Sequence, residues 1–151
     1  MTFEVRIDDL SFGGQIYSAG GEAAVRLDVS RTMSGYALRA RFDADLSGPC
    51  MRCLEGASAR VEVDSREIDQ PDDAEELRSP YVEESTLDLR GWARDALALA
   101  LPTQISCRAE CLGLCARCGE NLNASPDHVH EPEPDPRWAK LAELNLDPPG
   151  A

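Results

Sequence analysis

The clearest pattern in the chain is an alternation of apolar and polar residues over positions 35–47. Apolar side chains occupy every even position from Tyr36 to Leu46, and charged side chains such as Arg39 and Asp43 lie between them. A period of two places one set on one face of a strand and the other set on the opposite face. We therefore predict a strand over residues 35–47 whose even positions face the core.

Three weaker alternating patterns predict further strands over residues 3–8, 22–31 and 57–68. Ser34-Gly35 is typical of a tight turn between the second strand and the third. Short strands joined by short turns favour an antiparallel sheet, which can expose one of its faces to solvent. Residues 9–21 contain two pairs of adjacent glycines and are predicted to form a loop.

One helix is predicted over residues 89–101. Its apolar side chains recur at helical spacing, Asp88 precedes it as a cap, and Pro102 ends it. The fold class is therefore α+β, an antiparallel sheet with one main packed helix. We expect the core to include Leu38, Phe42, Val61, Trp92 and Leu97.

Two segments lack a packing pattern. Residues 69–80 are acidic and bounded by prolines, which is typical of a mobile loop, and residues 126–136 resemble an extended linker with four prolines. Asp135-Pro136 is a typical helix start, so a short terminal helix carrying Trp138, Leu141 and Leu144 is expected. The predicted organisation is a sheet and helix over 1–102, a cysteine- and histidine-rich segment over 103–131, and a tail over 132–151.

The charge balance limits the partners of the chain. Its 151 residues carry 15 basic and 28 acidic groups, a net charge of −13. No segment is strongly basic, so the electrostatic footprint of a nucleic-acid binder is missing, and acidic membranes are disfavoured for the same reason. No membrane span or signal peptide is visible in the sequence. We therefore expect a cytoplasmic protein that binds a basic protein partner, without tight direct binding to RNA and without a membrane.

All six cysteines lie in close pairs, and the only two histidines form a fourth pair. The pairs are Cys50-x2-Cys53, Cys107-x3-Cys111, Cys115-x2-Cys118 and His128-x-His130. Four pairs of soft ligands make two sets of four, the number that tetrahedral zinc takes in structural sites. Gly119 can adopt the positive φ that often follows a Cys-x2-Cys turn. The sequence therefore predicts two zinc ions, one of them held by a C-terminal cysteine-rich zinc knuckle.

The order of the pairs favours one grouping of ligands. Cys107 and Cys111 directly follow the predicted helix and can return to the edge of the sheet where Cys50 lies. The turn at 115–118 is then free for the downstream histidines, whose rings point to the same side in an extended segment. The expected sites are Cys50, Cys53, Cys107 and Cys111 for one ion, and Cys115, Cys118, His128 and His130 for the other.

Other interpretations of these side chains stay open at the level of sequence. Six cysteines can form three disulfides, although a cytosolic chain of this length seldom uses them. Cys50 and Cys53 can form a redox pair, although neither Cys-x2-Cys pair lies at a strand-to-helix junction of a βαβ unit. The cysteines can also be buried without metal, the two histidines can be solvated in an acidic tail, and thiolate sets can hold iron–sulfur clusters.

Catalytic motifs are weak in this chain. Gly13-Gly14 and Gly20-Gly21 lack the strand–loop–helix context of a phosphate-binding loop. Both histidines fall in a predicted linker, and the acidic run 69–88 has no apolar setting that would shift a carboxyl pKa. We therefore expect a protein without enzymatic activity.

Four blocks of sequence carry a family resemblance. They are Cys50-Met-Arg-Cys53-Leu54 after a strand, Ala-Leu-Pro at 100–102, the string Cys-x3-Cys-x-Gly-Leu-Cys-x2-Cys-Gly-x-Asn-Leu-Asn at 107–123, and Asp135-Pro136-Arg137-Trp138-Ala139. In this order, over roughly residues 40–146, the chain resembles the bacterial and plastid YceD family, the large ribosomal RNA subunit accumulation proteins. Many of those relatives carry Cys-x-Cys where this chain has His128-Val-His130, a change that keeps metal-ligand chemistry.

The resemblance implies a role in the synthesis, processing or stability of 23S ribosomal RNA, with no known enzymatic activity. We therefore expect a zinc-stabilised accessory protein of large-subunit ribosome biogenesis that acts through a basic ribosomal or rRNA-processing protein. The alternative, from a different functional class, is a thiol redox protein or sensor that uses the Cys50/Cys53 pair.

Overall fold

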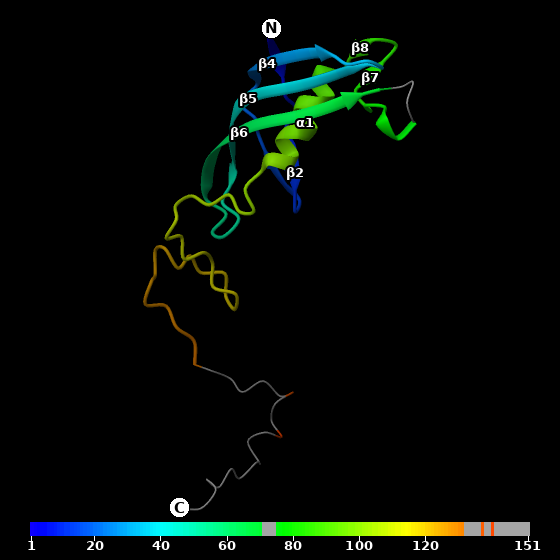
Figure 1. Cartoon of the computed structure of the whole chain (residues 1–151). Helices are drawn as coiled ribbons and strands as arrows, with labels where there is room; N and C mark the ends of the chain where they lie inside the picture. The colour runs from blue at the N-terminus through cyan, green and yellow to red at the C-terminus, as the bar shows by residue number, and fades with distance from the viewer. Residues whose placement is uncertain (71–74, 132–136, 138–139, 141–151) are drawn as a thin grey trace, which may run out of the picture.

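The structure is a computed structural model that describes residues 1–70, 75–131, 137 and 140. Its body is a four-stranded antiparallel sheet with one helix, α1 (Leu89–Ala100), on one face (Figure 1). The strand order is β1 (Thr2–Arg6), β4 (Glu22–Arg31), β5 (Tyr36–Pro49) and β6 (Gly56–Asp69). The predicted α+β class, with an antiparallel sheet and one helix, is confirmed.

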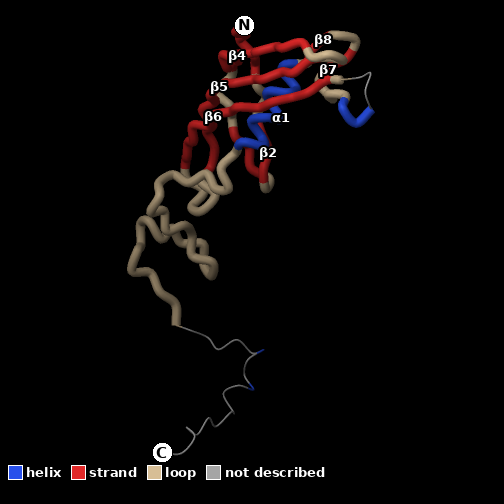
Figure 2. Tube along the Cα trace, in the orientation of Figure 1, coloured by secondary structure: helices blue, strands red, loops and turns tan. Residues whose placement is uncertain are grey.

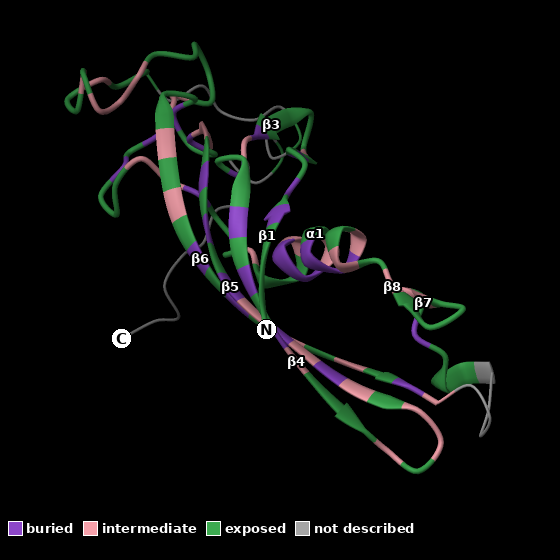
Figure 3. Cartoon of the chain, turned by 90° about the horizontal axis from the view of Figure 1, so that it is seen from above, coloured by how far each residue is buried: buried purple, intermediate pink, exposed green. Residues whose placement is uncertain are grey.

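The two longest strands, β5 and β6, pair along their whole length, from Tyr36 opposite Asp69 to Pro49 opposite Gly56. Figure 3 shows buried and exposed residues alternating along them, as the sequence pattern predicts. Leu38 and Phe42 are buried on the inner face, and so is Val61. The alternation fails at one end of the sheet, because Val29 and Tyr36 belong to the apolar set but are 45% and 37% exposed.

Helix α1 covers the inner face of the sheet with a stripe of buried side chains, Trp92, Ala93, Ala96 and Leu97. The Asp88 carboxylate caps its start, because it accepts the Gly91 N–H at 2.9 Å. Trp92 donates its indole N–H to the Ser65 hydroxyl on β6 at 3.0 Å, which fixes the helix on the sheet. The predicted helix and its cap are confirmed, and it ends at Ala100, one residue early.

Two short hairpins were missed by the sequence analysis (Figure 2). The loop predicted over 9–21 is wrong, because it contains β2 (Leu10–Phe12) paired with β3 (Gln15–Tyr17). Gly13 and Gly14 form the turn with φ angles of 57° and 77°, which glycine adopts without strain. Tyr17 is buried against Gly48 of β5, where an added Cβ would lie 2.4 Å from its ring.

The second missed hairpin, β7 (Val82–Glu83) with β8 (Thr86–Leu87), follows the acidic segment predicted to be a loop. That segment is partly ordered, since a short 3₁₀ helix η1 spans Glu75–Leu77. Asp69 is buried and accepts the Ser79 N–H at 3.2 Å. Residues 71–74 and the predicted terminal helix at Trp138, Leu141 and Leu144 lie outside the described residues.

After α1 the chain runs to the end of the sheet where β5 turns into β6, and then projects beyond it (Figures 1 and 2). Residues 101–131 form turns and one isolated bridge, between Leu114 and Asn121. All the cysteines and histidines of the chain lie in this segment or in the β5–β6 turn. Within the described part of the chain, no helix is long and apolar enough to cross a membrane.

Candidate metal centres

The turn between β5 and β6 forms half of the first cysteine cluster. Cys50 follows the last residue of β5, and Cys53 lies three residues before β6 begins. The turn closes through two backbone bonds, from the Cys50 N–H to Glu55 O at 2.6 Å and from the Leu54 N–H to Cys50 O at 3.0 Å. A tight hairpin turn thus places both sulfurs on the same side of the chain.

The segment after α1 supplies the other half of this cluster. Met51 donates its N–H to Ile105 O at 2.8 Å, and Leu114 donates its N–H to Arg52 O at 3.1 Å, so the two segments run side by side. Gly113 lies close to the turn, because an added Cβ would lie 3.1 Å from Arg52 O. Cys107 and Cys111 lie between these two attachments, and they therefore face Cys50 and Cys53.

The four sulfurs have the spacing of a tetrahedral metal site. Cys50 Sγ lies 3.8 Å from Cys111 Sγ, and Cys53 Sγ lies 3.6 Å from Cys107 Sγ. Zinc–sulfur bonds of about 2.3 Å place the sulfurs of a tetrahedron about 3.8 Å apart. All four ligand atoms lie within 4.8 Å of one another. We call this group, Cys50, Cys53, Cys107 and Cys111, the first centre.

Burial and hydrogen bonds act against each other on the thiols of the first centre. Burial opposes ionisation of Cys50, but the N–H groups of Cys53, Arg52 and Cys107 outweigh it and lower its pKa to about 6. The Glu55 N–H favours the Cys53 thiolate, but burial and the neighbouring sulfurs raise the pKa of Cys53 to about 12. Four thiolates so close together need a cation to hold them ionised.

A second turn with the same backbone pattern begins at Cys115. Its N–H donates to Glu120 O and the Gly119 N–H donates to Cys115 O, both at 2.8 Å. Gly119 has a φ of 78°, as the sequence predicts for the residue after such a turn. The N–H groups of Arg117 and Cys118 lower the pKa of Cys115 to about 6. The chain therefore uses one kind of turn twice, in Cys50-Met-Arg-Cys53-Leu54-Glu55 and Cys115-Ala-Arg-Cys118-Gly119-Glu120.

Both histidines turn their Nε2 atoms towards this second turn. His130 Nε2 lies 3.2 Å from Cys115 Sγ, and His128 Nε2 lies 3.2 Å from Cys118 Sγ. The two Nε2 atoms are 3.0 Å apart, with the ring planes at 88°. We call this group, Cys115, Cys118, His128 and His130, the second centre.

The structure brings the eight residues together in the two groups of four that the sequence predicts. The two groups differ in exposure. Cys50, Cys53 and Cys111 of the first centre are buried, whereas Cys118 and His130 of the second are exposed. None of the six cysteines forms a disulfide. Either group can hold a metal ion that prefers sulfur and imidazole ligands.

Side chains from the Asn-Leu-Asn string support the first centre, which the sequence analysis did not anticipate. Asn123 donates its amide to Cys111 Sγ at 3.5 Å and thereby lowers the pKa of that thiol. Asn121 donates to Glu55 Oε1 at 2.9 Å, across the gap between the two turns. The only signal in the sequence was the string itself, which begins at Asn121, two residues after Gly119.

Comparison with known proteins adds a family and several relatives. A family model described as large ribosomal RNA subunit accumulation protein YceD matches residues 38–145. Uncharacterized proteins of Mycobacterium bovis and Mycobacterium tuberculosis are each 39% identical to the chain over 124 residues, which cover 78% of this chain and 59% of theirs. An uncharacterized protein of Mycobacterium leprae is 37% identical over 101 residues, 63% of this chain and 46% of its own length.

The chain therefore spans about three fifths of the length of the first of these curated relatives, 59%. No solved structure matches the chain. The family match covers β5 from Leu38 onwards, the whole of β6 and α1, and every residue of both centres.

Proposed function

The chain belongs to the YceD family, and on that premise we propose that it is an accessory protein of large-subunit ribosome biogenesis in the cytoplasm, without enzymatic activity. The observation that carries this proposal is the family match over residues 38–145, whose description names accumulation of the large ribosomal RNA. The proposed role is to support the synthesis, processing or stability of 23S rRNA.

Zinc is the metal that we propose for both centres. Four thiolates, or two thiolates with two imidazoles, are the ligand sets of structural zinc, and the sulfur spacings of 3.6 and 3.8 Å in the first centre fit it. An ion in the first centre would tie the β5–β6 turn to the segment after α1. No ligand position is left open for a substrate in a site that uses all four residues, which supports a structural role.

The burial of the Cys50/Cys53 pair favours this role over thiol redox chemistry. Cys50 is 0% exposed and Cys53 is 4% exposed. An exchanging thiol must reach the sulfur of another molecule, which needs access as well as ionisation. The two sulfurs also face Cys111 and Cys107 rather than an open surface.

We propose further that the chain reaches rRNA through a basic ribosomal or rRNA-processing protein. Its net charge of −13 repels phosphate. On the outer face of the sheet, Arg39 is paired with Asp64 at 2.6 Å and Arg60 with Asp43 at 2.8 Å. These guanidinium groups are already neutralised, which leaves them less able to bind an RNA backbone.

Depletion of the protein in cells tests the proposed role. We expect the ratio of 23S to 16S rRNA to fall, and to recover when the wild-type chain is supplied. A Cys53→Ser chain should restore the ratio only in part if the first centre is needed for a stable fold. An unchanged ratio in fully depleted cells would contradict the proposed function.

Metal analysis of the purified chain tests the zinc assignment separately. Protein prepared without chelator should contain about two zinc ions per chain and give no reaction with a thiol reagent under native conditions. Bound iron with visible absorption would show that the metal assignment is wrong. Metal-free protein with a reactive Cys50 or Cys53 would favour the redox alternative.

A further inference from the structure

The inner face of the sheet is left open at the end away from the metal centres. The turn between β4 and β5 projects beyond α1, so the helix does not cover the end of β4 or the start of β5 (Figure 3). Val29 and Tyr36 are 45% and 37% exposed there, and Met33 in the turn is fully exposed. Apolar side chains that the helix would cover elsewhere therefore face solvent.

Two adjoining hollows lie at this end, between the sheet and the β7–β8 hairpin. The smaller, of about 270 Å³, has an apolar lining that includes Leu27, Val29, Leu38 and Leu87. The larger, of about 560 Å³, shares Tyr36 with it and is lined mainly by polar groups. Together they form an apolar floor that opens into a charged rim.

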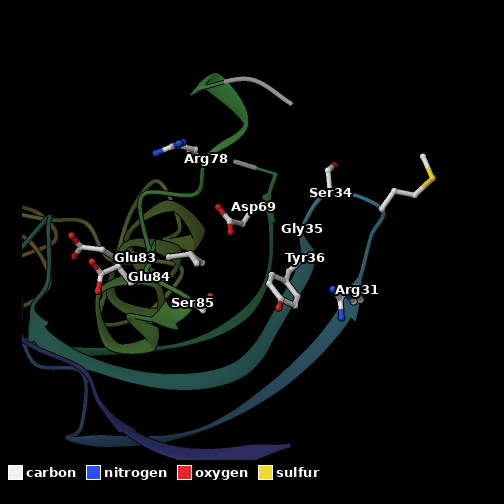
Figure 4. A pocket seen from close by; sticks show the side chains of 11 residues that line it. Arg31, Ser34, Gly35, Tyr36, Asp69, Arg78, Glu83, Glu84 and Ser85 are labelled. Atoms are coloured by element: carbon white, nitrogen blue, oxygen red, sulfur yellow. The ribbon is translucent and has the colours of Figure 1, made fainter. Parts of the chain in front are cut away.

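Carboxylates predominate around the rim. Figure 4 shows Arg31 and Tyr36 on the sheet side, Glu83 and Glu84 on the hairpin side, and Asp69 between them. Arg31 and Arg78 also line the hollow, so its own lining carries two cations against three anions. Glu83 and Glu84 are both exposed, so their carboxylates can meet a partner at the edge of the apolar floor. The lining of the larger hollow therefore carries more anions than cations.

The turn of the hairpin holds its two central residues in an uncommon conformation. Glu84 and Ser85 have φ angles of 45° and 66°, whereas the turn of the β2–β3 hairpin uses Gly13 and Gly14 for the same purpose. Non-glycine residues with positive φ carry backbone strain, and strained residues cluster at functional sites. The strained turn keeps the Glu83 and Glu84 side chains at the edge of the hollow.

We propose that this hollow, which we call the distal groove, is the docking site of the basic protein partner. An apolar side chain of the partner would cover the floor formed by Leu27, Val29 and Leu38, and flanking lysines or arginines would approach Glu83 and Glu84. The apolar floor supplies affinity and the acidic rim supplies orientation and fast association. The inference rests on the proposed function for the identity of the partner, and on the structure for the place where it binds.

The test uses fluorescein-labelled 12-residue peptides as probes and the full, metal-loaded chain. One peptide carries six lysines and a central leucine, the second has alanine in place of leucine, and the third has glutamate in place of every lysine. We expect the first to bind about tenfold more tightly than the second, because leucine buries more apolar surface than alanine. The third should not bind.

Variants of the chain locate the binding. Glu83→Gln with Glu84→Gln should weaken binding of the lysine–leucine peptide about threefold and reduce its dependence on salt. Val29→Lys should weaken it further. The control pair, Glu4→Gln with Glu22→Gln, removes the same charge from exposed positions on β1 and at the start of β4, and should leave binding unchanged.

Equal losses in both pairs of variants, or equal binding of the leucine and alanine peptides, would overturn the distal groove as a docking site. Direct binding of a labelled, protein-free 23S rRNA fragment to the wild-type chain, lost in Arg31→Gln, would overturn it in favour of RNA. These outcomes are separate from the depletion experiment. A lowered 23S rRNA ratio together with no peptide binding at the groove would leave the proposed function in place and remove only this site.

Discussion

At Leu54 the backbone adopts a conformation that leucine rarely takes. Its φ is 64° and its side chain is 58% exposed, while the equivalent residue of the second turn is Gly119. We predict that Leu54→Gly raises the free energy of unfolding by about 0.5–1 kcal/mol, because relief of the strain exceeds the entropy that glycine adds to the unfolded chain. Urea unfolding of the metal-loaded chain measures the change.

The reciprocal substitution is the control for this prediction. Gly119→Leu introduces the same strain in the second turn and should lower the free energy of unfolding, or the affinity of the second centre for metal, by a similar amount. If Leu54→Gly destabilises the chain, then the leucine side chain contributes packing that outweighs its strain, and the two turns are not equivalent.

Arg41 controls the ionisation of Asp28 across the outer face of the sheet. Its guanidinium donates to Asp28 Oδ2 at 2.5 Å and holds the pKa of Asp28 below 3.8. A pKa lowered in the folded state stabilises the fold above the unfolded pKa, and this contribution is lost as the pH falls through the folded pKa.

We predict that Arg41→Gln raises the pKa of Asp28 towards 3.8, measured by the pH dependence of its carboxyl resonance in NMR. Arg60→Gln, which breaks the pair with Asp43 instead, should leave the pKa of Asp28 where it is. An unchanged pKa in Arg41→Gln would show that the ion pair does not form in solution.

The ligand residues were accessible from sequence because cysteine pairs are rare and their spacing is fixed by the geometry of a turn. The spacing of Cys50 and Cys53, and of Cys115 and Cys118, predicted that these side chains are metal ligands. The hydrogen bond from Asn123 to Cys111 could not be predicted, because it joins residues of two separate turns whose packing is visible only in three dimensions.

At the scale of elements, the face of the sheet that packs under α1 determines the stability of the body. Leu38 is 6% exposed on that face, while its neighbour Ala37 points to the partly exposed outer face. We predict that Leu38→Asp lowers the free energy of unfolding by about 3–5 kcal/mol, because it buries an unpaired charge. Ala37→Asp should cost much less. Thermal unfolding of both variants measures the difference, and equal melting temperatures would show that the face assignment is wrong.

The two centres should differ in the ease with which they lose metal. The first is buried and joins segments that are far apart in the sequence, whereas the second has exposed ligands within one short segment. We predict two phases of zinc release to a chromogenic chelator, a fast one from the second centre and a slow one from the first.

Variants assign these phases. His130→Ala should remove the fast phase and leave the thermal unfolding of the sheet unchanged. Cys53→Ser should remove the slow phase and lower the unfolding temperature. A single phase with both ions released together would show that the centres are coupled, which the hydrogen bond between Asn121 and Glu55 makes physically possible.

Strands β4, β5 and β6 and the helix could be predicted because each repeats its period over ten or more residues. The hairpins could not, since β2, β3, β7 and β8 have only two or three residues each. Glu84 and Ser85 also give no turn signal, because glycine or asparagine is the usual residue at positive φ. The exposure of Val29 and Tyr36 depends on where α1 begins over the sheet, and alternation along a strand carries no information about that.

For the molecule as a whole, the net charge distinguishes direct binding to ribosomal RNA from binding through a basic protein. Direct binding needs lysines or arginines that replace counterions on the phosphates, and the affinity then falls steeply with salt. This chain has 15 basic residues against 28 acidic ones. Several arginines on the described outer face of the sheet, such as Arg39 and Arg41, already bind carboxylates.

We therefore predict no tight binding of the chain to protein-free 23S rRNA fragments near physiological salt. A basic partner should instead associate quickly, with a rate that falls as salt is added, because opposite charges steer the encounter. Gel shifts with the rRNA fragments and stopped-flow association with the labelled lysine–leucine peptide, each at two salt concentrations, measure the two cases. Nanomolar, salt-dependent binding to the naked RNA would contradict the adaptor role, since it would mean that local arginine clusters overcome the net negative charge.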